Sequence, residues 1–418
     1  MAGAARRPQR RGMSYDIIIV GGGIAGSSLG IAARRLNLRV LIVEAEREFR
    51  DRIRGEGLHS WGVREARRLG VADLLYQTCA RALPLWDTYV NGALVERRDL
   101  PASSLAACES MAFFHPEMQA ALFSAAEKEG AHVLRGAHVE GVEPGRLPRV
   151  AIRVEGAPNR IETARLVVVA TGRGSGFRSK LGLRTASGAH GLSVSGLVLH
   201  DVDFPDDAVS LWFAPSFGAA VPVYPLPHNR ARVYLVWNPR RDDTSFAGSD
   251  AIGPFVARCH QWGVPPECLR TARAKGPLAT FDGTPTWAVG PWPQGVALLG
   301  DAAGSLDPAF GAGLSLALLD ARTLIEQLGG DVDLTERARR YERERAIYYE
   351  KLLRLESLGG RILYGVSSPG DAPHLALLPR LRELGLDIVG AGPYCDIDDH
   401  TEQSLFGAAD GNEARPPA

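Results

Sequence analysis

Cysteine and lysine are scarce in this chain of 418 residues. There are five cysteines, an odd number, and no two of them are spaced as C-x-x-C. This usage argues against a disulfide framework and a zinc site, so we expect no metal and a reducing, cytoplasmic setting. Only four of the 48 basic residues are lysines, and the first 127 residues contain none. Chemistry that needs a lysine in that stretch is therefore excluded.

Excess charge of one sign and long apolar runs are also missing. The formal net charge is zero, which gives no support for binding to nucleic acid. No stretch of about 18 apolar residues is present, so no membrane span is expected. Residues 1–13 are rich in arginine and lack a signal-peptide core, and residues 407–418 are polar. We predict a disordered arm and a disordered tail in these two segments.

Glycine is abundant in contrast, and it gathers in two turns near residues 21 and 300. The first turn follows Tyr15–Val20, a β-branched apolar run typical of a strand buried on both faces. Three glycines then fit G-x-G-x-x-G at the start of a helix predicted over residues 24–36. This spacing permits a tight turn, close approach of a pyrophosphate to the backbone and the helix N-terminus, and close packing of helix on strand. The expected dinucleotide contacts are Gly21, Gly23, Ile24, Ala25 and Gly26.

A carboxylate ends the second predicted strand. The apolar run Arg39–Val43 is followed by Glu44, about 20 residues after the glycine turn. A carboxylate here accepts hydrogen bonds from ribose hydroxyls and repels a 2′-phosphate, so this site is not expected to hold NADP. Strand, turn, helix, strand and acid in this order predict a dinucleotide site. The alternative is a glycine-rich turn that binds nothing.

The second turn lies between an apolar run at 295–299 and a helix predicted over 313–328. Asp301 is placed to hydrogen-bond the ribityl chain of a flavin, and a turn or N-cap aspartate is the common alternative. The glycines beyond it let the backbone run against an isoalloxazine ring, and the following helix N-terminus favours the anionic reduced flavin. Two such turns in one folded unit predict FAD. The expected flavin contacts are Asp301, Pro308, Gly311, Ala312 and Gly313.

These motifs resemble those of the p-hydroxybenzoate hydroxylase-like superfamily of FAD enzymes, from about residue 14 to about residue 350. That superfamily includes single-component aromatic hydroxylases, flavin halogenases, squalene epoxidase-like enzymes and geranylgeranyl reductases. The segment R-I-R-G-E-G-L at 52–58 is similar to the hydroxylase segment whose arginine contacts the flavin pyrophosphate. The resemblance implies this role for Arg54, with Arg52 as the second choice. A solvated loop arginine is the alternative for both.

Residues 167–178, V-V-V-A-T-G-R-G-S-G-F-R, are similar to the second fingerprint of the family, Ala-Asp-Gly-x-x-Ser-x-x-Arg. Thr171 stands where the family usually has aspartate, an acid associated with flavin and nicotinamide binding. Gly304 replaces a frequent histidine, a feature shared with the reductase branch. The resemblance implies further cofactor contacts at His115, Val139, Thr171 and Gly172. For His115, a surface position at a helix N-terminus is the alternative.

The order of these motifs predicts an α/β fold in which a discontinuous Rossmann-like FAD-binding domain carries an inserted antiparallel-sheet substrate domain and C-terminal helices. Strand-like runs between residues 192 and 237 predict the sheet that covers the flavin. The FAD-binding domain is expected over residues 14–78, 110–184 and 285–330. The substrate domain is expected over 79–109 and 185–284, and a C-terminal helical region over 331–406.

The substrate pocket is expected between this sheet and the flavin ring. Its candidate side chains are His59 and Trp61, which follow R-G-E, and Trp212 and Tyr224, which lie on predicted strands. Alternation along a strand directs some side chains to the pocket and others away from it. A place in the core is therefore the alternative for each aromatic residue. No catalytic residue is assigned, because the flavin carries out the difficult chemistry.

The resemblance implies a FAD-dependent monooxygenase that inserts one oxygen atom from O₂ into an organic substrate through a flavin C4a-hydroperoxide. An aromatic compound or another secondary metabolite is the expected substrate. The first alternative is a geranylgeranyl reductase-like enzyme, which reduces an alkene without consuming O₂. A flavin halogenase is disfavoured, because its channel lysine and its Trp-x-Trp-x-Ile-Pro motif are absent. A non-catalytic binding protein on the same fold would not need Glu44 and Asp301.

The electron source is not specified by these motifs, because the chain contains no second dinucleotide fingerprint. The hydroxylase-like members of the superfamily take NADPH or NADH as a transient reductant, and other members receive reduced flavin from a separate flavin reductase. Both sources are kept as expectations.

Overall fold

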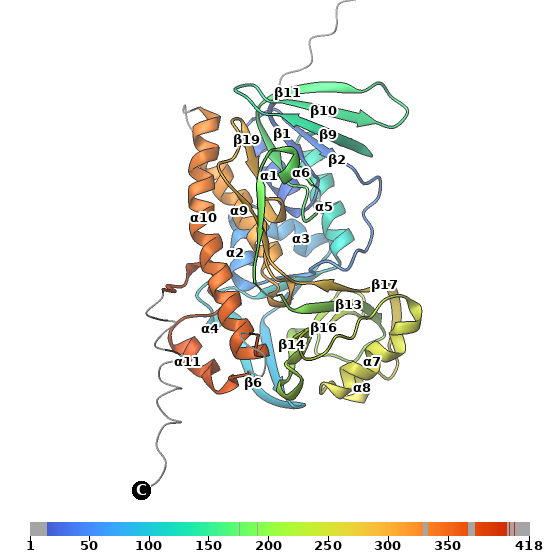
Figure 1. Cartoon of the computed structure of the whole chain (residues 1–418). Coiled ribbons are helices and arrows are strands. Elements are labelled where there is room, and N and C mark those ends of the chain that lie inside the picture. The colour runs from blue at the N-terminus through green and yellow to red at the C-terminus, as the bar shows by residue number, and fades with distance from the viewer. Residues whose placement is uncertain are drawn as a thin grey trace, which may run out of the picture.

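Two large sheets form the frame of the molecule, one above the other, with a long helix running along one side of both (Figure 1). The computed structural model describes residues 15–398 apart from 175, 190, 329–332 and 367–372, together with residues 401 and 405. The arm and the tail expected at 1–13 and 407–418 lie outside these residues. The chain therefore has the mixed α/β fold that the sequence predicts.

The first sheet contains the parallel strands expected for a nucleotide-binding unit. Its order is β8-β2-β1-β11-β10-β9, and β19 also pairs with β11. Its interior strands consist of apolar, mostly β-branched residues buried on both faces, which is typical of parallel strands covered by helices. The parallel strands are β1 (Tyr15–Val20), β2 (Val40–Glu44), β8 (His132–Arg135), β11 (Arg160–Val169) and β19 (Val296–Leu298). An antiparallel ribbon of β9 (Ala137–Glu143) and β10 (Arg149–Val154) extends the first half of β11.

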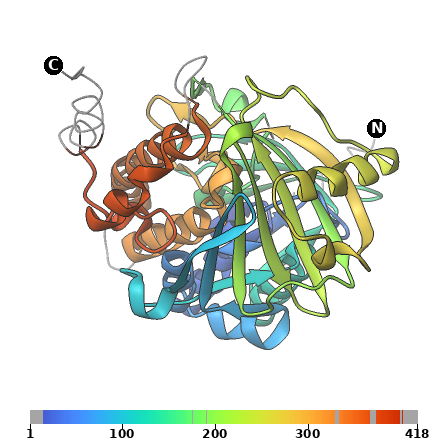
Figure 2. The same cartoon turned by 90° about the horizontal axis from the view of Figure 1, so that it is seen from below.

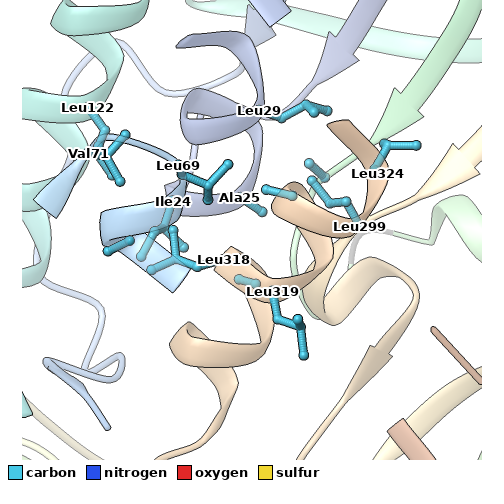
Figure 3. Packing of buried hydrophobic residues seen from close by; sticks show 14 of the residues in the cluster. Ile24, Ala25, Leu29, Leu69, Val71, Leu122, Leu299, Leu318, Leu319 and Leu324 are labelled. Carbon is cyan, nitrogen blue, oxygen red and sulfur yellow. The ribbon is translucent and has the colours of Figure 1, made fainter. Parts of the chain in front are cut away.

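Helices cover this sheet and bury its core. Figure 3 shows apolar side chains of α1 (Ile24–Arg35) meeting those of α9 (Gly313–Leu328). Glycine is required where α1 meets the strand, because a Cβ at Gly26 would lie 2.0 Å from the carbonyl oxygen of Gly21. The other helices of this layer are α2 (Ser60–Arg68), α3 (Ala72–Thr78) and α5 (His115–Lys128).

The second sheet has the order β17-β13-β16-β15-β14-β5-β6 and is antiparallel except for the pairing of β14 with β5. It takes strands from two separate parts of the chain, which the parallel pair joins. The strands are β5 (Leu85–Val90), β6 (Ala93–Asp99), β13 (Ser193–His200), β14 (Ala208–Ala214), β15 (Ala219–Leu226), β16 (Arg230–Trp237) and β17 (Arg273–Asp282). Its outer face is covered by α7 (Ile252–Gln261), with α8 (Pro266–Leu269) nearby (Figure 2).

Short elements connect the two sheets. One small sheet has the order β3-β7-β4 and another has the order β12-β18-β20. Their strands are β3 (Gly57–Leu58), β4 (Ala80–Leu83), β7 (Ser110–Phe113), β12 (Arg184–Ser187), β18 (Thr286–Val289) and β20 (Gly304–Ser305). The remaining short helices are α4 (Leu100–Ser103), α6 (Phe177–Lys180) and α11 (Leu378–Glu383). Within the described ranges, no helix is long and apolar enough to cross a membrane.

The long helix α10 (Leu334–Gly359) runs beside the first sheet (Figure 1). Polar side chains fasten it there. Tyr341 donates to the carbonyl oxygen of Leu298 on β19, at 3.1 Å. One turn further, Arg345 donates to Asp320 of α9 at 2.9 Å, and both side chains are buried. Tyr349 donates to the carbonyl oxygen of Ser305, at 2.8 Å. The middle of the helix is therefore fastened to β19, to α9 and to the second glycine turn.

Candidate functional site

The fold brings the two glycine-rich turns together. The strands β1 and β19 both run parallel to β11, one on each side, so their carboxyl ends lie at the same edge of the sheet. A Cβ at Gly300 would lie 3.7 Å from the Cβ of Ala25. The second turn therefore touches the helix that follows the first turn, as a single extended ligand across both would require.

Within the first turn, Gly21 is crowded and Gly23 is open. Gly21 has a φ of +107°, and a Cβ there would lie 2.5 Å from the carbonyl oxygen of Ala170. At Gly23 the nearest atom to such a Cβ is Nε2 of Gln119, at 3.8 Å, and the residue is half-buried. The backbone is thus accessible where a pyrophosphate would approach the N-terminus of α1. Glu44 closes the turn, because its carboxylate accepts the backbone N–H of Gly22 at 2.7 Å.

In the second turn, the carboxylate of Asp301 has no hydrogen-bond partner among the described residues. Its Oδ1 lies 4.0 Å from the Cβ position of Gly313, where α9 begins. Burial raises the pKa of Asp301, an effect opposed by the charges of Arg173, Arg54 and two further arginines. Gly311 adopts a φ of +67°, which a side chain would strain. The turn offers an acceptor and open backbone to a polar ligand.

Arg54 projects toward the same edge. Its Nη1 lies 3.3 Å from the position that a Cβ on Gly172 would occupy, and its guanidinium forms no ion pair with any described residue. Arg52 is instead paired with the exposed carboxylate of Glu46, at 2.6 Å. Thr171 and Gly172 are half-buried beside the first turn. Of the two candidate arginines, the structure brings Arg54 to the turns.

The second fingerprint segment is tied to the second turn by its arginine. Arg178 donates to the carbonyl oxygen of Asp301 at 2.7 Å and to that of Ala302 at 2.9 Å. It also donates to Oγ1 of Thr286 at 3.2 Å. The arginine therefore holds the backbone of the turn in place. The serine of this fingerprint, residue 175, lies outside the described residues.

A buried ion pair anchors the segment that carries Arg54. Arg232 of β16 donates to both carboxylate oxygens of Glu56 at 2.9 Å and to Asp51 at 2.8 Å. The side chains of Arg232 and Glu56 are completely buried. Tyr234 of the same strand donates to the carbonyl oxygen of Arg54, at 2.9 Å. Sequence reasoning missed Arg232, and the available signal was an arginine that directly precedes the largely apolar run of residues 233–237.

His115 lies behind this segment, at the start of α5. Its Nδ1 is 2.8 Å from the carbonyl oxygen of Gly55, and its backbone N–H donates to Glu56 at 3.2 Å. Burial lowers the pKa of His115 to about 4, so the ring is neutral near pH 7. The surface alternative for His115 is therefore wrong. Val139 lies on β9, half-buried, and packs against a core cluster that includes Val43, the residue before Glu44.

A cavity of about 140 Å³ lies between the second sheet, the second turn, α10 and the segment that follows it. Its lining is mainly apolar, with Phe213 from the sheet, Phe310 from the turn and Leu355 from α10 among its residues. His59 and Tyr224 line its turn end. The Cβ position of Gly311 is 3.3 Å from Nε2 of the histidine and 3.2 Å from Oη of the tyrosine.

Two of the four pocket candidates are corrected by the structure. Trp61 is completely buried, and its indole N–H donates to the carbonyl oxygen of Ile388 at 2.9 Å, so it belongs to the core. Trp212 lies on the opposite face of the sheet, stacked on Tyr89 at 4.6 Å. Alternation places its neighbour Phe213 in the cavity wall instead. Neither tryptophan lines the cavity.

The segment after α10 forms the outer wall of the cavity. Its apolar residues include Leu381, Leu386 and Val389, and it is fastened to β6 by an ion pair between Asp387 and Arg98 at 2.6 Å. Sequence reasoning assigned this segment only a helical tendency. The signal for its role was its high leucine content in a region with little regular structure.

Comparison with curated proteins shows similarity over most of the chain. The menaquinone reductase of Mycolicibacterium smegmatis is 28% identical over 342 residues, which cover 76% of this chain and 78% of that protein. The digeranylgeranylglycerophospholipid reductase 2 of Methanothermobacter thermautotrophicus is 25% identical over 320 residues, covering 73% and 75%. The squalene epoxidase of Schizosaccharomyces pombe is 43% identical over 58 residues, which are 14% of this chain and 13% of that protein.

Solved structures share the fold at low sequence identity. A flavoprotein/dehydrogenase from Cytophaga hutchinsonii superposes with a TM-score of 0.76 at 16% identity, covering 96% of this chain and all of that one. For 2-methyl-3-hydroxypyridine-5-carboxylic acid oxygenase the TM-score is 0.66 at 19% identity, with 83% and 91% covered. The family model described as an FAD binding domain matches residues 14–355. Both glycine turns and the strands between them fall inside that match, and the chain belongs to the FAD binding domain family.

Proposed function

We propose that this protein is a FAD-dependent monooxygenase that transfers one oxygen atom from O₂ to an apolar organic substrate. The observation that carries the proposal is the mainly apolar cavity that ends at the second glycine turn, where the flavin ring is expected. An apolar cavity beside the cofactor suits oxygen transfer, because apolar walls and a bound substrate exclude water from the reacting atoms. Family membership and the similarity to a squalene epoxidase and to the fold of an oxygenase support the same reaction.

The residues at the turns fit FAD in their chemistry. The open backbone at Gly23, the unpartnered carboxylate of Asp301 and the unpaired guanidinium of Arg54 each offer what one part of the cofactor needs. The proposed contacts are Gly21, Gly23, Ile24, Ala25, Gly26, Glu44, Arg54, His115, Val139, Thr171, Gly172, Asp301, Pro308, Gly311, Ala312 and Gly313.

When bound, FAD supplies the two electrons and the activation of O₂ that the reaction needs. The chain supplies binding, orientation and exclusion of water. The N-terminus of α9 directs its positive end toward the ring site, and Phe310 and the leucines of α10 keep the cavity apolar. No protein nucleophile is required. The substrate-binding part is proposed to be residues 79–109 and 185–284, together with the wall that follows α10.

NADH or NADPH is proposed as the transient reductant, with a separate flavin reductase as the second source of electrons. Thr171 replaces the aspartate that hydroxylases use at this position, which favours testing both sources. All five cysteines are free. Free thiols are typical of a reducing compartment, which supports a cytoplasmic setting.

The test is to follow the fate of oxygen. FAD-loaded protein is mixed with NADH or NADPH under ¹⁸O₂ in the presence of a panel of apolar substrates, and O₂ uptake and product mass are measured. One ¹⁸O atom per product supports the proposal. Reduction of an alkene or of a quinone such as menadione without O₂ uptake would contradict it. That result would support the second candidate, a reductase, which the similarity to the menaquinone reductase favours.

A further inference from the structure

Of the two ring nitrogens of His59, one forms a hydrogen bond and the other has no partner among the described residues. Its Nε2 lies 2.7 Å from the carbonyl oxygen of Phe310. A carbonyl oxygen only accepts, so Nε2 carries the proton, and in the neutral ring Nδ1 is an acceptor. Burial lowers the pKa of His59, so the ring is neutral near pH 7. No described residue donates a hydrogen bond to Nδ1. His59, which lines the cavity, thus has one ring nitrogen that accepts and that has no hydrogen-bond partner among the described residues.

Tyr224 places a hydroxyl at the same end of the cavity. Its ring packs against the backbone of Gly57, where a Cβ would lie 2.5 Å from the ring, and its Oη forms no hydrogen bond with any described residue. This Oη lies 3.2 Å from the Cβ position of Gly311, and Cε1 and Nε2 of His59 both lie 3.3 Å from it. The ring of Trp86 lies 5.9 Å from that of His59 and is apolar on its faces. The tyrosine hydroxyl and the histidine ring therefore line one end of the cavity together in largely apolar surroundings.

The charged residues of the cavity wall are already neutralised. Arg98 is paired with Asp387 at 2.6 Å, and both side chains are largely buried. Arg382 is paired with Glu96 of β6. Because both arginines of the wall have carboxylate partners, the described lining residues offer no free cation to a substrate carboxylate or phosphate. The ligand that fits these walls is neutral.

We infer that His59 and Tyr224 are specificity-determining residues that bind a hydroxyl group on a neutral and otherwise apolar substrate. The hydroxyl donates to Nδ1 of His59 and accepts from Oη of Tyr224, which fixes its end of the molecule at the second glycine turn. This inference rests on the proposed function for the identity of the cavity as the substrate site. A site built to pair a hydroxyl rejects an analogue without the donor, because a buried polar group is then left unpaired.

Two probes test the inference, 2-naphthol and 2-methoxynaphthalene. They share a rigid apolar ring system, but only 2-naphthol has a hydroxyl group that can donate a hydrogen bond. Each is titrated into oxidised, FAD-loaded protein, and binding is followed by the change in flavin absorbance. We expect the wild-type protein to bind 2-naphthol at least about tenfold more tightly, as one buried hydrogen bond implies. His59→Phe should reduce this ratio to about twofold or less.

Variants of Tyr224 and of His59 distinguish the contributions of these two residues to probe binding. Tyr224→Phe should weaken both probes by similar factors and keep the ratio, because the ether oxygen and the hydroxyl oxygen both accept from the tyrosine. His59→Gln retains a donor for the carbonyl of Phe310 but moves the acceptor, so the ratio should fall here as well. The matched control is His260→Phe on α7, a histidine bonded to the carbonyl oxygen of Val264 and outside the cavity wall, which should leave both affinities unchanged.

The outcomes that overturn the inference are specific. One is an unchanged ratio in both His59 variants while they retain FAD and the wild-type flavin spectrum. Others are a wild-type protein that does not distinguish the probes or that binds neither of them. No turnover occurs in these titrations. Failure of the proposed function is therefore recognised separately, as absence of ¹⁸O in products from a protein that still prefers 2-naphthol.

Discussion

Replacing Arg232 with methionine should destabilise the protein and release the segment that carries Arg54. Arg232 donates three charge-assisted hydrogen bonds, two to Glu56 and one to Asp51, at 2.8–2.9 Å. Although burial opposes its charge, the hydrogen bonds and the charge of Glu56 raise the pKa of Arg232, so it remains protonated. Methionine would leave the completely buried carboxyl group of Glu56 without its partner. Breaking a buried pair in this way costs about 3–5 kcal/mol.

Urea-induced unfolding, followed by tryptophan fluorescence, measures this free energy of unfolding. The double variant Arg232→Met/Glu56→Leu should recover part of the loss, because the completely buried carboxyl group of Glu56 is then no longer left without its arginine. Its free energy of unfolding should remain about 1–3 kcal/mol below that of the wild type, since the backbone N–H of His115 loses its acceptor. The control is Arg273→Met on β17, whose side chain is 83% exposed and whose ion pair should contribute less than about 1 kcal/mol.

FAD affinity, measured by titration of flavin fluorescence, should fall in Arg232→Met, because Tyr234 and the ion pair together hold the loop that presents Arg54. The reasoning is refuted if Arg232→Met loses less than about 1 kcal/mol. It is refuted equally if the double variant is no more stable than the single one, since an unpaired carboxylate would then not be the cause.

Three further predictions concern the turn, the long helix and the core. Gly26→Ala should lower the free energy of unfolding by more than about 2 kcal/mol and abolish FAD retention, because the new Cβ would overlap the carbonyl oxygen of Gly21. A variant that is purified with the wild-type FAD content would contradict this prediction. Burial raises the pKa of Glu356 well above its usual value, so the folded state favours the protonated form; this stability is present at low pH and is lost as the pH rises through the raised pKa. Glu356→Gln should therefore gain in melting temperature relative to wild type as pH increases, and a difference independent of pH would count against it. Trp61→Phe should lower the free energy of unfolding by about 1–3 kcal/mol, because the carbonyl oxygen of Ile388 loses its donor. The affinity for 2-naphthol should be unchanged, and an altered affinity would show that Trp61 belongs to the pocket.

Local patterns were sufficient for the nucleotide-binding part of the fold. The helix predicted over 24–36 is observed at Ile24–Arg35, and the one predicted over 313–328 is observed at Gly313–Leu328. Each follows a short apolar strand and a glycine turn, and these signals lie within a few residues of one another. The strand–helix–strand order at the N-terminus also predicts that its two strands run parallel, because a connection through a helix has few solutions, and β1 and β2 are parallel neighbours.

The cavity could not be predicted in the same way. Whether Trp212 or Phe213 faces it depends on which side of the sheet α7 covers, and no residue near either one carries that information. The pair of Arg232 with Glu56 joins residues 176 positions apart. The outer wall comes from a segment with one short helix, where periodicity is too weak to assign a face. Long-range packing determines all three features.

The long helix α10 sets a fixed distance between the proposed flavin site and the cavity that is proposed to hold the substrate. Tyr341, Arg345 and Glu356 fasten it to β19, to α9 and to the second turn, respectively, and its last two turns form part of the cavity wall. One residue inserted into α10 would rotate all later residues of the helix by about 100° about its axis, so the contacts before and after the insertion could not form together. Sequence length should therefore be rigidly maintained in this stretch during evolution. The wall beyond Gly359 is not held by this helix, so we predict that relatives that differ there bind other substrates and keep the same flavin site.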